Sequence, residues 1–291
     1  MKGIILAGGY GKRLYPLTKY ISKQLLPIYD KPMIYYSLSV LMHAKIKDIL
    51  IITNPEFISF YEDLFGDGSH LGLNINYKIQ KAPKGIAEAF ILGEEFIDKN
   101  NVCLVLGDNL FVGRSLPNLL SNCIEKLSKN LCSIVAYKIS DPERFGVVEF
   151  DEKMSVKSIE EKPKKPKSQY AVTGIYFFTN NVVDLAKDLK PSQRGELEIT
   201  DINNIFISKN KMSVEIMDSK VFKWLDTGTF DALNEASDYI QSFQKKTHQL
   251  IGLPEEIAYQ NNFINLNQLK KNLPNLSIDL QNYLMKKYLG G

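Results

Sequence analysis

The chain has 291 residues, of which 44% are hydrophobic and 24% are charged, and its formal net charge is only +3. These values are typical of a globular protein with a large core, and they argue against disordered, collagen-like and coiled-coil proteins. Lysines gather only locally, as in residues 162–167, so the charge gives no indication of a nucleic-acid-binding surface. We therefore expect no nucleic acid among the partners of this protein.

The three cysteines and three histidines are scattered along the chain. Cys103, Cys123 and Cys132 have no CxxC spacing, and we expect them to be reduced, buried thiols. The histidines lack the spacing of a metal site. No apolar run is long enough to span a membrane, and the N-terminus is strand-like rather than a signal peptide. We therefore expect a cytoplasmic protein that contacts no membrane.

The N-terminal half alternates between short apolar runs and amphipathic stretches. The apolar runs are typical of strands that are buried on both faces, and they span residues 2–7, 48–53 and 102–107. The stretches with a helical pattern span residues 33–44, 56–65 and 85–97. This alternation predicts a Rossmann-like α/β fold with three layers, in which helices cover both faces of the sheet.

After about residue 131 the chain changes to strand-like segments with little helix between them. These segments span residues 132–139, 146–150, 156–160 and 172–178. They predict an insertion that gives the central sheet a mixed character. The later elements are expected to be helices at 182–189 and 198–208, a strand at 213–217 and an amphipathic helix at 229–243.

We therefore expect one domain over residues 1–244, divided into halves at about 1–130 and 131–244. Residues 245–291 are expected to form a C-terminal helical extension with breaks at Pro254 and Pro274. Because this extension contains no motif that carries chemistry, we expect it to pack against the domain or to contact another subunit.

A glycine-rich segment, residues 8–13 (GGYGKR), directly follows the first predicted strand. Glycines allow a ligand to approach the backbone closely, successive N–H groups can bind a phosphate, and Lys12 and Arg13 add positive charge. The segment is not a dinucleotide-binding fingerprint, which needs Gly or Ala in place of Leu14, nor a Walker loop, which needs Gly in place of Leu6. The alternative is a tight strand-to-helix turn that binds no ligand.

Further motifs along the chain indicate which kind of site this segment belongs to. GGYGKRLYPLT, followed by KQLLP at residues 23–27, resembles the GGxGTRLxPLT…K.LLP signature of the sugar nucleotidylyltransferase family. Other stretches, in unbroken order up to about residue 260, resemble its glucose-1-phosphate thymidylyltransferase branch. They are YDKPMIYY (29–36), LGDN (106–109), DPERFGVVEF (141–150), EEKPKKPKS (160–168), AVTGIYF (171–177), RGELEITDIN (194–203) and WLDTGT (224–229). The resemblance implies a nucleotidyltransferase fold with a sugar-binding insertion.

The resemblance also implies a reaction, in which glucose 1-phosphate attacks the α-phosphorus of dTTP and yields dTDP-glucose and pyrophosphate. This is the first step of dTDP-sugar synthesis, for example of dTDP-rhamnose for cell-surface polysaccharide. A sugar phosphate has a second pKa of about 6, so it is largely ionised at neutral pH and needs no general base. The protein must instead position two polyanions and stabilise the leaving pyrophosphate with cations and a metal ion.

Two aspartates are candidate metal ligands. Asp108 follows the predicted strand 102–107, at the carboxyl edge where open α/β sheets bind ligands, and Asp226 lies in WLDTG. Both resemble the magnesium ligands of the family, and Mg²⁺ prefers a few carboxylates combined with phosphate oxygens and water. The alternative role of each is that of a turn or N-cap aspartate.

The candidate nucleotide site combines the glycine-rich segment with later residues. Arg13 and Lys23 resemble the cations that bind the triphosphate in the family. The amide of Gln80 can both donate to and accept from a pyrimidine, and Gly85 would leave room for the base. The residues assigned to the nucleotide are Gly8, Gly9, Gly11, Lys12, Arg13, Gln24, Gln80, Gly85 and Asp108.

The candidate sugar-phosphate site lies in the second half. Lys162 resembles the lysine that meets the sugar phosphate, and the guanidinium of Arg194 suits phosphate oxygens. Either could instead be an ordinary surface charge, and Val172 a core residue. The residues assigned to the sugar phosphate are Phe145, Gly146, Glu161, Lys162, Val172 and Arg194, and those assigned to catalysis are Arg13, Lys23, Asp108, Lys162 and Asp226.

Two residues depart from the family pattern. Lys12 stands where Thr or Ser is usual, and Phe145 where Tyr is common, which leaves triphosphate binding and the identity of the sugar open. The alternatives are the same chemistry with UTP or another hexose phosphate, a catalytically silent nucleotide-sugar sensor, and a nicotinamide dehydrogenase, which Leu14 disfavours. The resemblance further implies a homo-oligomer, a tetramer.

Overall fold

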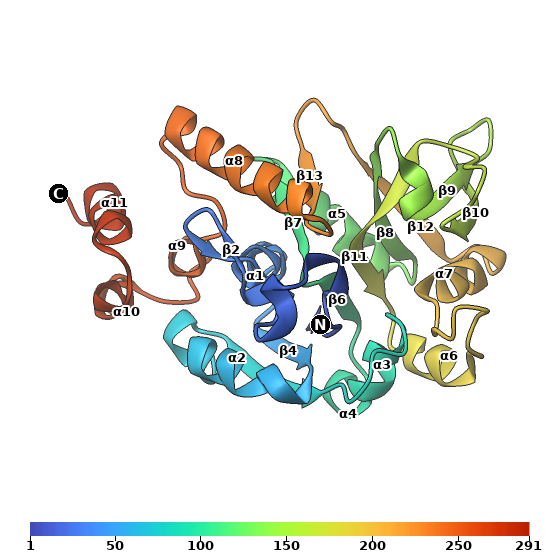
Figure 1. The fold of residues 1–291 in the computed structure, drawn as a ribbon, viewed down its shortest axis with the longest axis horizontal. Helices are drawn as coiled ribbons and strands as arrows, with labels where there is room; N and C mark the ends of the chain where they lie inside the picture. Colours follow the sequence, from blue (N-terminus) through green and yellow to red (C-terminus); the bar gives the residue numbers. More distant parts are fainter. Residues whose placement is uncertain (291) are drawn as a thin grey trace.

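The computed structural model describes residues 1–290, which contain one nine-stranded mixed sheet (Figure 1). Its N-terminal strands are parallel and lie in the order β6-β1-β4-β5. They are β1 (Lys2–Ala7), β4 (Asp48–Thr53), β5 (Asn74–Ile79) and β6 (Val102–Leu106). Ile5 stands opposite Ile51 on one side and Val105 on the other, so the aliphatic runs pair with one another. The predicted Rossmann-like α/β fold is confirmed.

The second half extends the same sheet. The long strand β11 (Tyr170–Phe178) pairs antiparallel with β6, with β8 (Cys132–Lys138) and with β9 (Gly146–Phe150). Outside these, β10 (Val156–Glu161) pairs with β9, and β12 (Met212–Met217) runs parallel to β8. The predicted mixed-sheet insertion is therefore continuous with the N-terminal sheet through β11.

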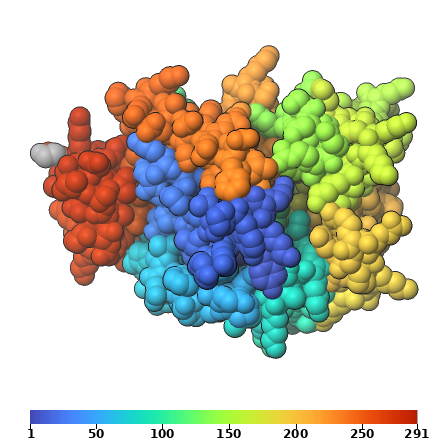
Figure 2. Space-filling model, viewed as in Figure 1, coloured from blue at the N-terminus to red at the C-terminus, as the bar shows by residue number. Residues whose placement is uncertain are grey.

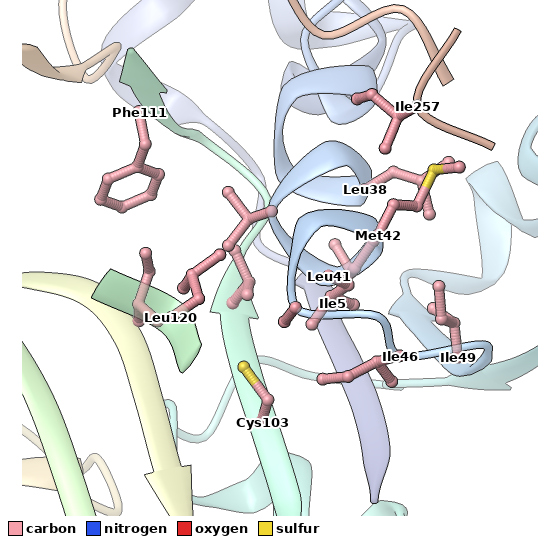
Figure 3. Packing of buried hydrophobic residues seen from close by; sticks show 14 of the residues in the cluster. Ile5, Leu38, Leu41, Met42, Ile46, Ile49, Cys103, Phe111, Leu120 and Ile257 are labelled. Carbon is pink, nitrogen blue, oxygen red and sulfur yellow. The ribbon is translucent and has the colours of Figure 1, made fainter. Parts of the chain in front are cut away.

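Helices cover both faces of the sheet and create two separate cores. Ile4 and Ile5 are neighbours in β1 and point to opposite faces, so they belong to different buried clusters. Figure 3 shows Leu41 and Met42 packed in the cluster of Ile5. The helices are α1 (Ile34–His43), α2 (Ile58–Phe65), α3 (Glu88–Leu92), α4 (Glu94–Ile97), α5 (Leu116–Ser128), α6 (Val182–Asp188), α7 (Ile199–Ser208) and α8 (Phe230–Thr247).

Several elements differ from those predicted. The expected helix at 85–97 is divided into α3 and α4 by Gly93, whose ψ of 6° is not helical. Two further features were not predicted: α5, and a separate two-stranded sheet in which β7 (Asn109–Val112) pairs with β13 (Lys223–Asp226). A short hairpin joins β2 (Pro27–Ile28) to β3 (Lys31–Pro32). The 3-10 helices are η1 (Lys12–Leu14), η2 (Leu17–Lys19), η3 (Lys23–Leu25), η4 (Pro55–Phe57), η5 (Ser69–Leu71), η6 (Pro142–Arg144) and η7 (Leu273–Asn275).

Three short helices follow α8 and lie at one end of the molecule, in red in Figure 1. They are α9 (Pro254–Gln260), α10 (Leu266–Asn272) and α11 (Ile278–Tyr288). Pro254 begins α9 in its first turn, where the missing N–H costs nothing, and thus starts a helix. The buried carboxylate of Glu256 in α9 accepts hydrogen bonds from Nζ of Lys287 (2.7 Å) and the hydroxyl of Tyr288 (2.9 Å), and these bonds hold α11 against α9.

The three cysteines are buried and form no disulfide, as predicted. Within residues 1–290, none of the helices has the length and apolar character needed to cross a membrane.

Candidate active site

Two adjoining cavities lie at the carboxyl ends of β1 and β6. We name the smaller one, of about 300 Å³, the loop cavity, and the larger one, of about 530 Å³, the insertion cavity. Arg13 and Asp108 line both cavities. Figure 2 shows the blue N-terminal segment, which contributes Arg13, at the surface beside the orange residues near α8. A ligand group in one cavity can therefore meet a ligand group in the other at these two side chains.

The glycine-rich segment forms one wall of the loop cavity. Gly9 and Gly11 have φ angles of +91° and +56°, in the left-handed region that favours glycine. The N–H of Gly9 donates to Oδ1 of Asn54 at 3.0 Å, which fixes the path of the segment. A Cβ on Gly8 would lie only 2.0 Å from Oε1 of Gln80. These positions need glycine because the backbone turns sharply and runs close to neighbouring side chains.

Lys23 and Asp108 also line the loop cavity, where they form an ion pair. Lys23 begins η3, and its Nζ lies 2.6 Å from Oδ2 of Asp108. Burial on its own would raise the pKa of Asp108, but the charge and hydrogen bond of Lys23, assisted by Arg13, hold this pKa below its usual value. Asp108 is therefore ionised and sits next to an ammonium group.

Asp226 reaches the site from the two-stranded sheet. The pairing of β13 with β7 places Asp226 opposite Asn109, the residue that follows Asp108. Oδ2 of Asp226 accepts a hydrogen bond from Arg144 at 3.1 Å. Burial, together with the negative charge of Asp108, raises the pKa of Asp226 above its usual value, although nearby cations oppose this effect. The two carboxylates are therefore close enough to repel each other.

A row of side chains fixes the orientation of Asp108. The indole N–H of Trp224 donates to Oδ1 of Asn109 at 2.7 Å, and Nδ2 of Asn109 donates to Oδ1 of Asp108 at 3.0 Å. The hydroxyl of Thr227 donates to the backbone carbonyl of Asp108 at 2.8 Å. One oxygen of Asp108 is thus held by Asn109 and the other by Lys23.

Glu161 is the last residue of β10 and Lys162 follows it, and both line the insertion cavity. Oε2 of Glu161 accepts a hydrogen bond from Thr200 at 2.8 Å, and Gly146 borders the same carboxylate. Lys162 has a φ of +45°, an unusual value for a residue with a side chain, and its N–H donates to the carbonyl of Phe145 at 2.9 Å. The turn directs the chain so that both Glu161 and Lys162 line the cavity.

The structure brings most of the predicted site residues together. The loop cavity is lined by Gly8, Gly9, Gly11, Lys12, Arg13, Lys23, Gln24 and Asp108. The insertion cavity is lined by Arg13, Asp108, Phe145, Gly146, Glu161, Lys162, Val172 and Asp226.

Three predicted residues line neither cavity. Gln80 is 3% exposed, and its Nε2 donates to Oε2 of Glu88 at 2.8 Å. A Cβ on Gly85 would lie 2.4 Å from the carbonyl oxygen of Leu197, so a close backbone contact explains this glycine. The guanidinium of Arg194 is bound by both oxygens of Glu198.

Comparison with known proteins agrees with this geometry. A model of the nucleotidyl transferase family matches residues 2–242. The chain belongs to the nucleotidyl transferase family. It is 52% identical to the glucose-1-phosphate thymidylyltransferase of Neisseria meningitidis, over 93% of each chain. The matching relatives confirm the predicted branch of the family and the predicted class of enzyme.

Solved structures of other nucleotidyl transferases share the fold. A crystal structure of a glucose-1-phosphate thymidylyltransferase from Bacillus anthracis, in complex with sucrose, is 41% identical, with a TM-score of 0.75 over 82% of this chain and 94% of that chain. A UDP-glucose pyrophosphorylase complexed with UDP-glucose is 26% identical, with a TM-score of 0.73 over 84% of this chain and 98% of that chain.

The carboxylates of this nucleotidyl transferase suit a metal ion that also binds its substrate. Within residues 1–290, no group of three or more His, Cys, Asp or Glu side chains could hold a metal ion. Asp108 and Asp226 supply only two carboxylates, and their mutual repulsion would be relieved by a cation between them. A Mg²⁺ ion accepts such a pair when phosphate oxygens and water complete its coordination. The residues present therefore fit Mg²⁺ bound together with a triphosphate.

Sequence reasoning missed several residues of this site. Arg144 pairs with Asp226 and lies in the DPERF motif, directly before Phe145, so its position next to an assigned residue was an available signal. Trp224 and Asn109 also lie in quoted motifs, but only the pairing of β7 with β13 shows that they touch. For Asn54, whose side chain holds Gly9, the sequence offers no signal.

Proposed function

We propose that this nucleotidyl transferase catalyses the Mg²⁺-dependent reaction of dTTP with glucose 1-phosphate. The observation that carries the proposal is the pair of adjoining cavities that share Arg13 and Asp108. One cavity combines glycine backbone with cations, which suits a triphosphate, and the other combines Glu161 with Lys162, which suits a sugar phosphate. A phosphate of each substrate can thus meet at the shared side chains.

In the proposed reaction, an oxygen of glucose 1-phosphate forms a bond to the α-phosphorus of dTTP as the bond to the β-phosphate oxygen breaks. Arg13 and Lys23 bind the triphosphate and balance the charge of the leaving pyrophosphate, and Lys162 holds the attacking phosphate. Arg194 would assist Lys162 once it is released from Glu198. Because the attacking oxygen is already ionised, no side chain has to remove a proton.

Asp108 and Asp226 would hold the Mg²⁺, which supplies positive charge to the phosphates when bound. Lys23 and Asn109 already orient the two oxygens of Asp108, and Arg144 orients Asp226. Glu161, Gly146, Val172 and Phe145 would shape the sugar pocket. Because these two carboxylates are already oriented, their side chains need little reorganisation when the substrate binds.

A substrate panel tests the proposal. The purified protein is mixed with Mg²⁺, each of four nucleoside triphosphates and several hexose 1-phosphates, and pyrophosphate is measured. We expect turnover of dTTP and UTP with glucose 1-phosphate, dTTP being preferred, and loss of turnover with EDTA. No turnover with either triphosphate and any sugar 1-phosphate would show that the proposal is wrong.

The base preference rests on Gln80. One hydrogen of Nε2 is given to Glu88, which leaves the second hydrogen free to donate and Oε1 free to accept. This donor and acceptor pair is complementary to thymine and uracil and not to cytosine. Because Gln80 lies behind the surface, this contact requires the loop that follows it, residues 81–85, to move. Equal rates with CTP and dTTP would rule out the role of Gln80.

Other candidates use the same site. A UTP-specific enzyme is the closest, since one structural neighbour is a UDP-glucose pyrophosphorylase, and the panel separates the two. A silent nucleotide-sugar sensor would bind both substrates without releasing pyrophosphate. Both Asp108 and Asp226 line the insertion cavity, which favours the enzyme.

We also propose a biological setting. Residues 1–244 would form the catalytic domain, with nucleotide and sugar halves, and residues 245–291 would support a homotetramer. The protein would act in the cytoplasm at the first step of dTDP-sugar synthesis, for example towards dTDP-rhamnose. Its three buried cysteines without disulfides agree with a reducing compartment. Light scattering at micromolar concentration would test the tetramer, and a monomer would contradict it.

A further inference from the structure

A row of buried hydrogen bonds lies directly behind the loop cavity. It links Tyr61, in α2, to Ser22 and Gln24, the two residues that flank Lys23. The hydroxyl of Tyr61 lies 2.7 Å from Oγ of Ser22, and Oγ of Ser22 donates to Oε1 of Gln24 at 2.8 Å. The three residues are 0%, 1% and 4% exposed, so water cannot replace these bonds.

Each hydrogen bond of this row has a donor and an acceptor. A serine hydroxyl carries one hydrogen, and in Ser22 this hydrogen is given to Oε1 of Gln24. With the hydrogen of Ser22 given to Gln24, the hydroxyl of Tyr61 is the group that can donate in their contact. Burial raises the pKa of Tyr61, so its phenol keeps the hydrogen that this role requires.

The hydrogen bond from Ser22 to Oε1 determines which end of the Gln24 amide faces the cavity. Gln24 lines the loop cavity, and with its oxygen bound to Ser22, its Nε2 is the end available to a ligand. A Cβ on Gly107 would lie 2.9 Å from Cγ of Gln24, so the stem of the side chain is closely confined. The amide can therefore reverse but cannot move far, and a reversed amide would present an oxygen to the phosphates.

We propose that Ser22 and Tyr61 are positioning residues that hold the Gln24 amide with its N–H groups turned towards a bound triphosphate. The proposal rests on the proposed function of the loop cavity. An N–H donor attracts a phosphate oxygen, whereas an amide oxygen in the same place repels it. Tyr61 thus acts on triphosphate binding from α2, without itself reaching the substrate.

Steady-state kinetics of Tyr61→Phe and Ser22→Ala test the proposal. We expect the KM for dTTP to rise about 3- to 10-fold, the range of one hydrogen bond, while the KM for glucose 1-phosphate stays within about 2-fold. A merely structural role would disturb both KM values or lower thermal stability instead. Tyr36→Phe is the matched control, because the buried hydroxyl of Tyr36 donates to the backbone carbonyl of Ile28 and contacts none of these three residues, and it should leave both KM values unchanged.

A double-mutant cycle makes the test independent of Ser22→Ala. In a Gln24→Ala background, Tyr61→Phe should have no further effect on the KM for dTTP, because the amide that it orients is gone. Equal effects of Tyr61→Phe with and without Gln24 would overturn the proposal, and so would an unchanged KM in all single variants. If wild-type protein neither binds nor turns over dTTP, the proposed function fails as well. Normal wild-type turnover with unaffected variants overturns only the positioning role.

Discussion

Nζ of Lys23 lies 2.6 Å from Oδ2 of Asp108, where the two cavities meet. The lysine side chain is only 8% exposed, so this pair is screened less by solvent than a surface pair. Asp226 pairs with Arg144 at 3.1 Å, but this guanidinium also pairs with Asp141 at 2.9 Å. Asp108 is thus balanced by Lys23 before any substrate binds, whereas Asp226 shares its cation and has a raised pKa. We expect a phosphate that enters the loop cavity to take over the contact of Lys23.

Replacement of either aspartate should abolish most activity. We expect Asp108→Asn and Asp226→Asn each to lower kcat at least about 100-fold, because each removes charge from the proposed metal site that the two residues would share. Pyrophosphate release measures the rate, and circular dichroism checks the fold. The double variant should be scarcely slower than either single one. Asp238→Asn, an exposed change of the same kind in α8, is the control. A near-normal rate in either active-site variant would remove that residue from the metal site.

Lys12→Thr should weaken the binding of dTTP. Lys12 is exposed and lines the loop cavity, so we expect its ammonium to contact the outer phosphates of bound dTTP. These phosphates carry high charge in both ground state and transition state, so we expect the KM for dTTP to rise about 3-fold with little change in kcat.

High salt should shrink this difference, because the contact is exposed to solvent. Lys19→Thr removes the same charge from a nearby exposed position, and we expect it to leave the KM for dTTP unchanged. Identical KM values for wild type and Lys12→Thr at low ionic strength would show that Lys12 points to solvent.

His43 should make the protein less stable in mild acid. It lies at the end of α1 and lines a third cavity, of about 330 Å³, which shares no residue with the other two. Burial lowers the pKa of His43 to about 4, although the charge of Glu256 opposes this. In the unfolded chain, the imidazole of His43 takes up a proton below about pH 6.5, whereas in the folded chain it does so only below about pH 4. The stabilisation is therefore complete above pH 6.5 and is lost as the pH falls towards 4.

Urea unfolding at pH 7 and pH 5 measures this effect. From the two pKa values, His43 should account for about 2 kcal/mol of the stability lost between these pH values, and His43→Gln should lack that share. His248→Asn, at an exposed position, should behave like wild type. An equal loss of stability in His43→Gln and wild type would contradict the assignment.

Glu256→Gln should weaken the attachment of α11 to α9. The carboxylate is buried, and it accepts hydrogen bonds from Lys287, Tyr288 and Tyr283. An amide loses the charge that pairs with Lys287, so we expect a loss of about 1–3 kcal/mol and faster hydrogen exchange in α11. Glu235→Gln, at an exposed position in α8, is the control. Unchanged exchange in α11 would show that apolar packing alone holds it.

The parallel strands could be predicted because their signal is local. Runs such as residues 2–7 and 48–53 are apolar throughout, as strands buried on both faces must be. The amphipathic helix α5 had a local signal as well, since Leu116, Leu120 and Leu127 lie on one face, and sequence reasoning overlooked it. The division of the helix at 85–97 depends on the single residue Gly93, which helices sometimes tolerate.

The contacts of the site could be predicted only in part. The motifs indicate which residues gather, and most of them do line the two cavities. They do not indicate that Arg194 is bound by Glu198, that Glu88 binds the amide of Gln80, or that Arg144 pairs with Asp226. Such pairings depend on the register and side-chain direction of elements far apart in the chain, which no local pattern records.

The sheet of β7 and β13 also sets the order in which the protein can become functional during synthesis. Trp224 and Asn109, whose side chains meet in this sheet, are 115 residues apart in the chain. A ribosome therefore makes the N-terminal half, about residues 1–130, and most of the insertion before it makes Asp226. Domains tend to fold from the N-terminus as they are made, so the parallel strands can form early while the carboxylate pair is still missing. A nascent chain that stops before β13 would expose the cationic loop cavity and Asp108, while the adjoining insertion cavity would still lack Asp226.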